Sequence, residues 1–110
     1  MGEFLKAKKL YEKALKIKEK QLGEFNCETA ISFNNLGNVS RCLNEYANAE
    51  GFYFQALNFY KSVSTNEIHP NYGPTIGNLG LVQKDLGTIK KFFFFLILHF
   101  VIQINRYLKN

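Results

Sequence analysis

The side chains in this 110-residue sequence that could do catalytic or metal chemistry are few and widely separated. His69 precedes Pro70 in an expected loop, and His99 lies in an apolar run. Neither histidine has a nucleophile and an orienting acid at a recognisable spacing. Cys27 and Cys42 have no histidine or cysteine partner at the spacing of a zinc site. The sequence therefore predicts a protein that is not an enzyme, with no cofactor and no metal.

Two further patterns that resemble sites have simpler explanations. Gly73, Gly77 and Gly80 suggest a phosphate-binding loop, but no strand is expected before them and no Gly-Lys-Ser/Thr follows, so we interpret them as turn and packing glycines. Helical geometry would place Cys27 and Cys42 about 22 Å apart, so free thiols are expected. No secretion signal opens the sequence, which makes the cytoplasm the expected compartment.

The elements that position these residues follow from an internal repeat. One set of residues recurs 42 positions later and a second set recurs 43 positions later. The first set is Phe4, Ala7, Tyr11, Ala14 and Leu15, which recur as Tyr46, Ala49, Tyr53, Ala56 and Leu57. The second set is Asn35, Leu36, Gly37, Val39 and Leu43, which recur as Asn78, Leu79, Gly80, Val82 and Leu86.

The apolar and small residues of each unit lie three and four positions apart, which is the spacing of a helix rather than a strand. Glycine, asparagine or proline interrupts the pattern at 23–28, 43–45, 62–74 and Gly87. The sequence therefore predicts helices near 3–22, 29–43, 46–61 and 74–86. Small residues such as Ala49 and Gly37 are expected to let helix axes approach closely. The predicted fold is all-α, a short α-solenoid of stacked antiparallel helix pairs.

A leucine-glycine pair on one helix, followed by alanine, an aromatic residue and alanine on the next, resembles the tetratricopeptide repeat. The unit's length, the run Asn34-Asn35-Leu36 and the pair His69-Pro70 resemble the kinesin-light-chain variety of that repeat. The resemblance covers residues 3 to about 91. It implies half of one unit, one whole unit near 29–61, and the first helix of the next. The matching residues are Leu36, Gly37, Ala49, Tyr53 and Ala56.

The resemblance also implies a function, because in such proteins the first helix of each unit lines a concave groove that binds peptides. Carried over by register, the groove residues are Asn34, Asn38, Arg41, Asn78 and Lys84. Asparagine can donate and accept hydrogen bonds, and arginine or lysine can pair with acidic side chains. We therefore expect a protein-interaction scaffold with an acidic protein or peptide partner. Kinesin heavy chain or a cargo, and a cytoskeleton-associated location, follow from the resemblance alone.

The alternative function rests on charge. The net charge is +5, and residues 1–22 hold seven lysines against three glutamates. A basic helix of this kind could associate with a membrane or with nucleic acid, but a lysine-rich face is more often a solvated surface. The same applies to the groove residues, which could be solvated helix positions. No nucleic-acid partner is expected.

The repeat pattern changes at the C-terminal segment, 92–110. Its register places Phe92 and His99 where alanines stand in the preceding unit, so close packing is lost. The run 92–104 is almost wholly apolar, with basic residues on both sides. Thirteen residues span about 20 Å, short of the ~30 Å hydrocarbon core of a bilayer. Three interpretations stay open: a distorted packing helix, sequence foreign to the repeat, and a short membrane anchor.

Overall fold

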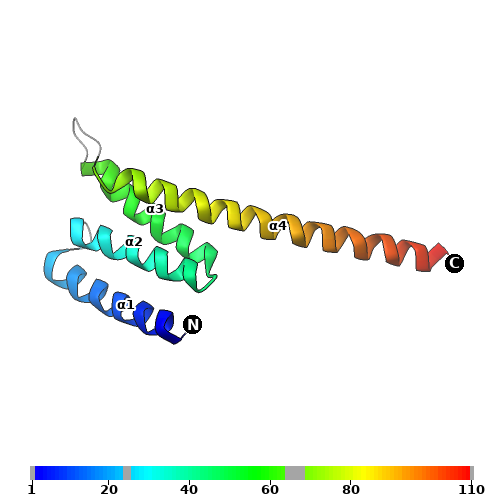
Figure 1. Ribbon diagram of the computed structural model, residues 1–110, viewed down its shortest axis with the longest axis horizontal. Helices are drawn as coiled ribbons and strands as arrows, with labels where there is room; N and C mark the ends of the chain where they lie inside the picture. The colour runs from blue at the N-terminus through cyan, green and yellow to red at the C-terminus, as the bar shows by residue number, and fades with distance from the viewer. Residues whose placement is uncertain (1, 24–25, 64–68, 110) are drawn as a thin grey trace.

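The computed structural model describes residues 2–23, 26–63 and 69–109, and these residues form four helices with no strand. The helices are α1 (Gly2–Leu22), α2 (Cys27–Cys42), α3 (Tyr46–Val63) and α4 (Tyr72–Lys109). Each helix packs on the one before it, and α4 also touches α2. Figure 1 shows α1, α2 and α3 side by side, with α4 lying along α3 and then projecting beyond the other helices. The all-α solenoid prediction is confirmed.

The first two turns form where glycine and asparagine predicted them. Gly23 follows α1 with a φ of 86°, a left-handed conformation that glycine adopts without a steric penalty. Asn26 caps α2, because its side chain accepts the amide of Thr29 while the Thr29 hydroxyl accepts the amide of Asn26. Asn44 takes a φ of 62° between α2 and α3. These local signals set the lengths of α1 and α2.

The core lies between α2, α3 and α4, and small residues let these helices approach. Ala49 and Ala56 are both fully buried, and because they are seven residues apart they lie on the same face of α3. Gly37 lies against the ring of Tyr53, so closely that a Cβ atom at position 37 would be 2.5 Å from that ring. Tyr53 is itself only 1% exposed. The prediction that Gly37 lets neighbouring helices approach closely is therefore confirmed.

The predicted end of the last helix near Gly87 is wrong, because α4 continues unbroken to Lys109. Gly87 is the repeat equivalent of Asn44, yet it does not take the left-handed conformation of that turn residue. A single helical glycine costs only about 1 kcal/mol relative to alanine, and no proline follows to stop the helix. No glycine or proline follows before Lys109, so nothing ends the helix, and α4 reaches a length of about 57 Å at 1.5 Å per residue.

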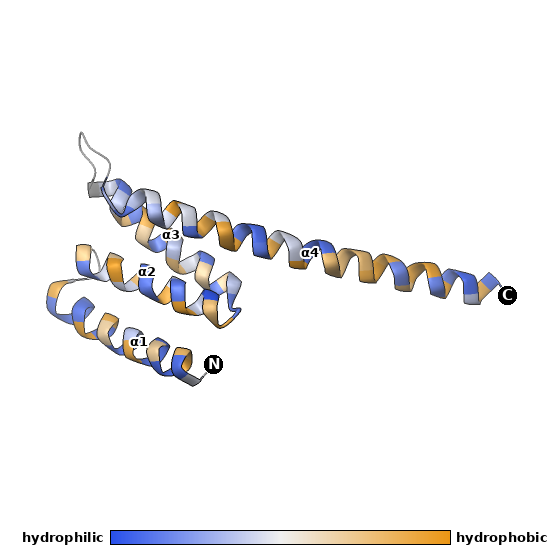
Figure 2. Ribbon diagram, in the orientation of Figure 1, coloured by the Kyte–Doolittle hydropathy of each residue, from blue (hydrophilic) through white to orange (hydrophobic). Residues whose placement is uncertain are grey.

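The second half of α4 has no packing partner among the described residues. All residues from 92 to 109 are exposed, so this segment does not pack on the preceding unit. The radius of gyration is 19.2 Å, against about 13 Å for a compact domain of this length. By length and composition α4 could cross a membrane, since it holds an 18-residue stretch of mean hydropathy 1.6 with none of it buried. Figure 2 shows the apolar residues on this projecting half.

Candidate peptide-binding surface between α2 and α4

Polar side chains of α2 and α4 meet in three contacts along the line where the two helices touch. The Thr75 hydroxyl donates to the Asn34 side-chain oxygen over 3.0 Å, and the Asn78 amide donates to the Asn38 oxygen over 3.3 Å. One further turn along, Arg41 Nε lies 3.6 Å from an Asp85 carboxylate oxygen. We call this surface the α2–α4 seam. It comprises Asn34, Asn38, Arg41, Thr75, Asn78 and Asp85.

The first contact is at the buried end of the seam. Thr75 is 2% exposed, and its hydroxyl lies within bonding distance of both Asn34 and the Asn71 carbonyl oxygen, 2.8 Å away. One hydroxyl proton serves these two acceptors, so the hydroxyl keeps a partner if Asn34 is removed. Asn34 therefore links the two helices as well as lining the surface.

Asn38 is exposed, and its side-chain oxygen also accepts a hydrogen bond from the Tyr53 hydroxyl over 2.6 Å. Tyr53 thus reaches from the core to the seam. Burial raises the pKa of its hydroxyl above the ordinary value of 10.0, and the positive charge of Arg41 opposes this only in part. The hydroxyl therefore stays protonated at neutral pH and holds the Asn38 amide in one orientation.

Replacing Tyr53 with phenylalanine is expected to lower the free energy of unfolding at neutral pH by about 1 kcal/mol, the usual contribution of one hydrogen bond. Because the folded pKa of Tyr53 is raised, its stabilising contribution is complete below pH 10.0 and is lost as pH rises through the folded pKa. The variant should therefore lose less stability between neutral and alkaline pH than the parent. Urea unfolding across that range measures this; an unchanged pH dependence would contradict it.

The third contact is electrostatic, because 3.6 Å is too long for a hydrogen bond. Arg41 Nε is buried without a hydrogen-bond partner, while both side chains are a little over one-third exposed. A pocket of about 230 Å³ opens beside the pair and is lined by both residues and the α2–α3 turn. The carboxylate of Asp85 offsets the positive charge that the sequence predicted for this surface.

Lys84 does not belong to the seam. It follows Asn78 by six residues, which at 3.6 residues per turn places it about 120° around the helix. Its side chain is exposed, and the seam contact at this level comes from its neighbour Asp85. The structure therefore brings Asn34, Asn38, Arg41 and Asn78 together and leaves Lys84 apart.

The sequence reasoning missed Thr75 and Asp85, and also two exposed apolar residues near the seam. Ile31 is 38% exposed on α2, and Leu81 is 46% exposed on α4. Helical spacing offered a signal, because Asp85 lies seven residues after Asn78 and therefore on the same face. Ile31 precedes Asn38 by the same interval.

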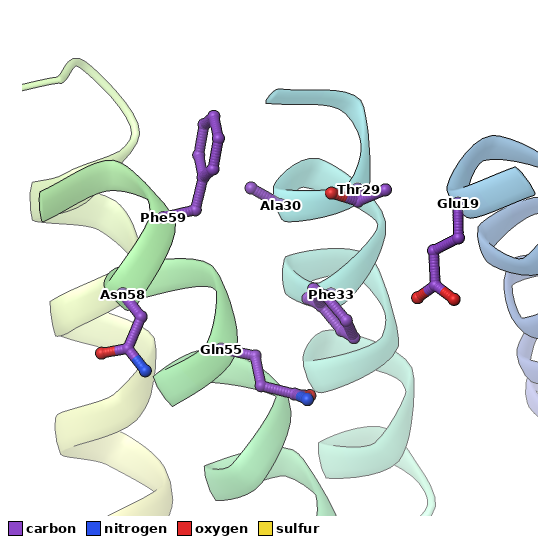
Figure 3. Close-up of a pocket in the computed structure, with 7 residues that line it drawn as sticks. All are labelled: Glu19, Thr29, Ala30, Phe33, Gln55, Asn58 and Phe59. Carbon is purple, nitrogen blue, oxygen red and sulfur yellow. The ribbon is translucent and has the colours of Figure 1, made fainter. Parts of the chain in front are cut away.

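A second depression lies between α1, α2 and α3, with a volume of about 490 Å³. Figure 3 shows Phe33 and Phe59 extending from α2 and α3, with polar side chains around them. None of the predicted groove residues lines it. Its lining residues are Glu19, Thr29, Ala30, Phe33, Gln55, Asn58 and Phe59.

The basic helix α1 is partly neutralised by its neighbours. Lys8 pairs with Glu45 at 2.6 Å, and Lys18 lies 3.8 Å from a carboxylate oxygen of Glu28. Both pairs join α1 to residues later in the chain, so these lysines help dock the helix. Within the described residues no group of three or more histidine, cysteine, aspartate or glutamate side chains could hold a metal ion, and Cys27 and Cys42 are exposed free thiols.

The fold and this surface define a helical-repeat protein in which side chains of successive units meet on a shared face. The sequence model of the tetratricopeptide repeat matches residues 1–62, more than half of the chain. The chain belongs to the tetratricopeptide repeat family, and its kinesin-light-chain-like features are consistent with that match. No curated protein matches the chain. Tetratricopeptide repeats generally mediate protein–protein interaction.

Proposed function

We propose that this chain is a protein-interaction scaffold that binds an extended peptide of a partner protein along the α2–α4 seam. The observation that supports this is the row of asparagine side chains at successive helical turns. Asn38 is exposed, while Asn34 and Asn78 are half-buried. The oxygens of Asn34 and Asn38 accept intramolecular bonds, so their amide N–H groups would donate to peptide carbonyl groups. Ile31 and Leu81 would contact apolar side chains of the same peptide.

The charge of the seam favours acidic peptides only weakly, because Asp85 offsets Arg41. Two units present less area for a partner than a full array of repeats would. We therefore expect dissociation constants of micromolar or poorer, which corresponds to about 8 kcal/mol or less of binding free energy. Selectivity would come from the fit of amides to an extended backbone rather than from charge.

Replacing Asn78 with alanine is expected to abolish detectable peptide binding while leaving helicity unchanged, because this side chain makes one long bond to an exposed partner. Binding is measured on an array of random acidic, neutral and basic peptides, followed by titration of the best binder. The matched control is Asn48→Ala, an exposed asparagine of α3 outside the seam. Equal binding by both variants would show that the seam is not the site.

Replacing Asp85 with asparagine is expected to strengthen binding of acidic peptides several-fold, because Arg41 would lose its intramolecular partner. Exposed ion pairs contribute about 0.2–1 kcal/mol, so the gain should be at most roughly fivefold. The gain should fall as salt is added, and neutral peptides should show none. An equal gain for neutral and acidic peptides would contradict the role assigned to Arg41.

The finer proposal is a cytoplasmic, cytoskeleton-associated adaptor of the kinesin-light-chain kind, with kinesin heavy chain or a cargo protein as partner. It rests on the length of the unit and the Asn34-Asn35-Leu36 run. Purified kinesin heavy chain, tested with the full chain and with Asn78→Ala, would distinguish seam-dependent binding from none. Absence of binding would remove this adaptor proposal and leave the peptide-binding proposal standing.

A second candidate function is membrane association, favoured by the unburied apolar half of α4. This candidate depends on α4 rather than on the lysines of α1, two of which are paired within the protein.

A further inference from the structure

One face of α1 is open, although the repeat-equivalent face of α3 is covered. Helix α3 packs against both α2 and α4, whereas α1 packs only against α2 among the described helices. The difference appears at equivalent residues, because Tyr53 on α3 is 1% exposed and Tyr11 on α1 is 37% exposed. Leu10, the equivalent of Phe52, is 67% exposed. The open face of α1 therefore corresponds to the face of α3 on which α2 packs.

A matching face of α4 is also open. On α2, Gly37 receives the ring of Tyr53, and Phe33 stacks on Phe52 at a centroid distance of 6.3 Å. The equivalents on α4 are Gly80, which has nothing within 4 Å of where a Cβ would lie, and Ile76, which is 44% exposed. The face of α4 that carries Gly80 therefore has the same small and apolar positions as the face of α2 that packs on α3.

We propose that these two faces bind each other between copies of the chain, so that α4 of one copy packs against α1 of a second copy. We expect the contact between copies to resemble the α2–α3 contact within one chain. Tyr11 of the second copy would lie over Gly80, and Leu10 of the second copy would contact Ile76. We infer a second copy rather than another protein because one chain carries both exposed faces, the α1 face and the matching α4 face.

The geometry of this association has a consequence for its stoichiometry. The two faces differ, so the contact is heterologous, and a copy bound through α4 still offers its own open α1. Association therefore continues head to tail with rising concentration. Blocking either face alone should leave monomers. A copy blocked only at α1 can still bind, through α4, a copy blocked only at α4.

The experiment uses the full chain and two variants in reducing buffer. Leu10→Lys blocks the α1 face and Gly80→Arg blocks the α4 face; both sites are exposed, so helicity should be retained. The matched controls are Leu5→Lys, an exposed leucine that lies about 140° around α1 from Leu10, and Gly51→Arg, an exposed glycine of α3. Sedimentation velocity is measured from about 1 to 100 µM, the range of weak association.

The parent chain and both controls should sediment faster as concentration rises. Leu10→Lys and Gly80→Arg should each lose this dependence, and their equimolar mixture should form a one-to-one dimer and nothing larger. Association through the apolar half of α4 would persist in every variant and would overturn the proposal. A monomeric parent chain, loss in one variant only, or no dimer in the mixture would overturn it too.

Discussion

Replacing Gly37 with alanine is expected to lower the free energy of unfolding by about 1 to 2 kcal/mol, although alanine is the better helix former. The added Cβ would lie 2.5 Å from the Tyr53 ring, and that ring is buried and cannot move into solvent. Overpacking of this kind costs about 1–3 kcal/mol, and the gain in helix propensity returns about 0.5–1 kcal/mol. Urea unfolding monitored by circular dichroism measures the difference.

Gly80→Ala is the matched control, because Gly80 is the repeat equivalent of Gly37 with open space around it. This substitution should raise the free energy of unfolding by about 0.5–1 kcal/mol through helix propensity alone. The protein should be kept dilute, so that contacts between copies do not contribute. Two changes of the same sign would show that the close approach of Gly37 to Tyr53 does not determine the packing of α2 on α3.

The helix pairs could be predicted from the sequence because the same pattern of small and large residues occurs in more than one unit. Alanine, tyrosine and alanine at Ala49, Tyr53 and Ala56 need a small residue opposite, and Gly37 supplies it. The end of α4 could not be predicted in this way. Asn44 makes the turn in the whole unit, but its equivalent Gly87 remains helical, since nothing after it ends the helix. Continuation of a helix depends on the residues that follow, not on the register of the repeat.

The α2 side of the seam could also be predicted, because one helical face carries Asn34, Asn38 and Arg41. The α4 side could be predicted only in part. Arg41 and Lys84 occupy equivalent positions in successive units. Two equivalent helices that lie parallel and side by side touch through opposite faces, so their equivalent residues do not meet. The side chain that meets Arg41 is therefore Asp85, not Lys84. Sequence register identifies equivalent positions, whereas contact between units depends on how the helices are placed side by side.

Ending the chain after Lys91 is expected to raise the solubility of the protein and to lower its tendency to aggregate at high concentration. The segment 92–104 holds eleven apolar residues, all exposed. An exposed apolar surface of this size normally marks an interface, a membrane segment or an aggregation site. Light scattering and the soluble fraction after centrifugation would compare the two proteins. If the shortened protein precipitates while the full chain stays monomeric, this segment belongs to the folded core.

Vesicles then separate membrane insertion from aggregation. Each apolar residue at the centre of a membrane helix favours insertion by about 0.3–0.6 kcal/mol, and a lysine there opposes insertion by about 2.5–3.5 kcal/mol. The 18-residue apolar stretch spans about 27 Å, close to the hydrocarbon thickness, and basic residues at both ends could reach lipid phosphates. The full chain should therefore float with neutral lipid vesicles, and Leu98→Lys should reduce flotation far more than Gln103→Lys, which changes a residue that is already polar. Because aggregates sediment whether or not lipid is present, a full chain that pellets beside floating vesicles would exclude the membrane function and leave aggregation as the property of this segment.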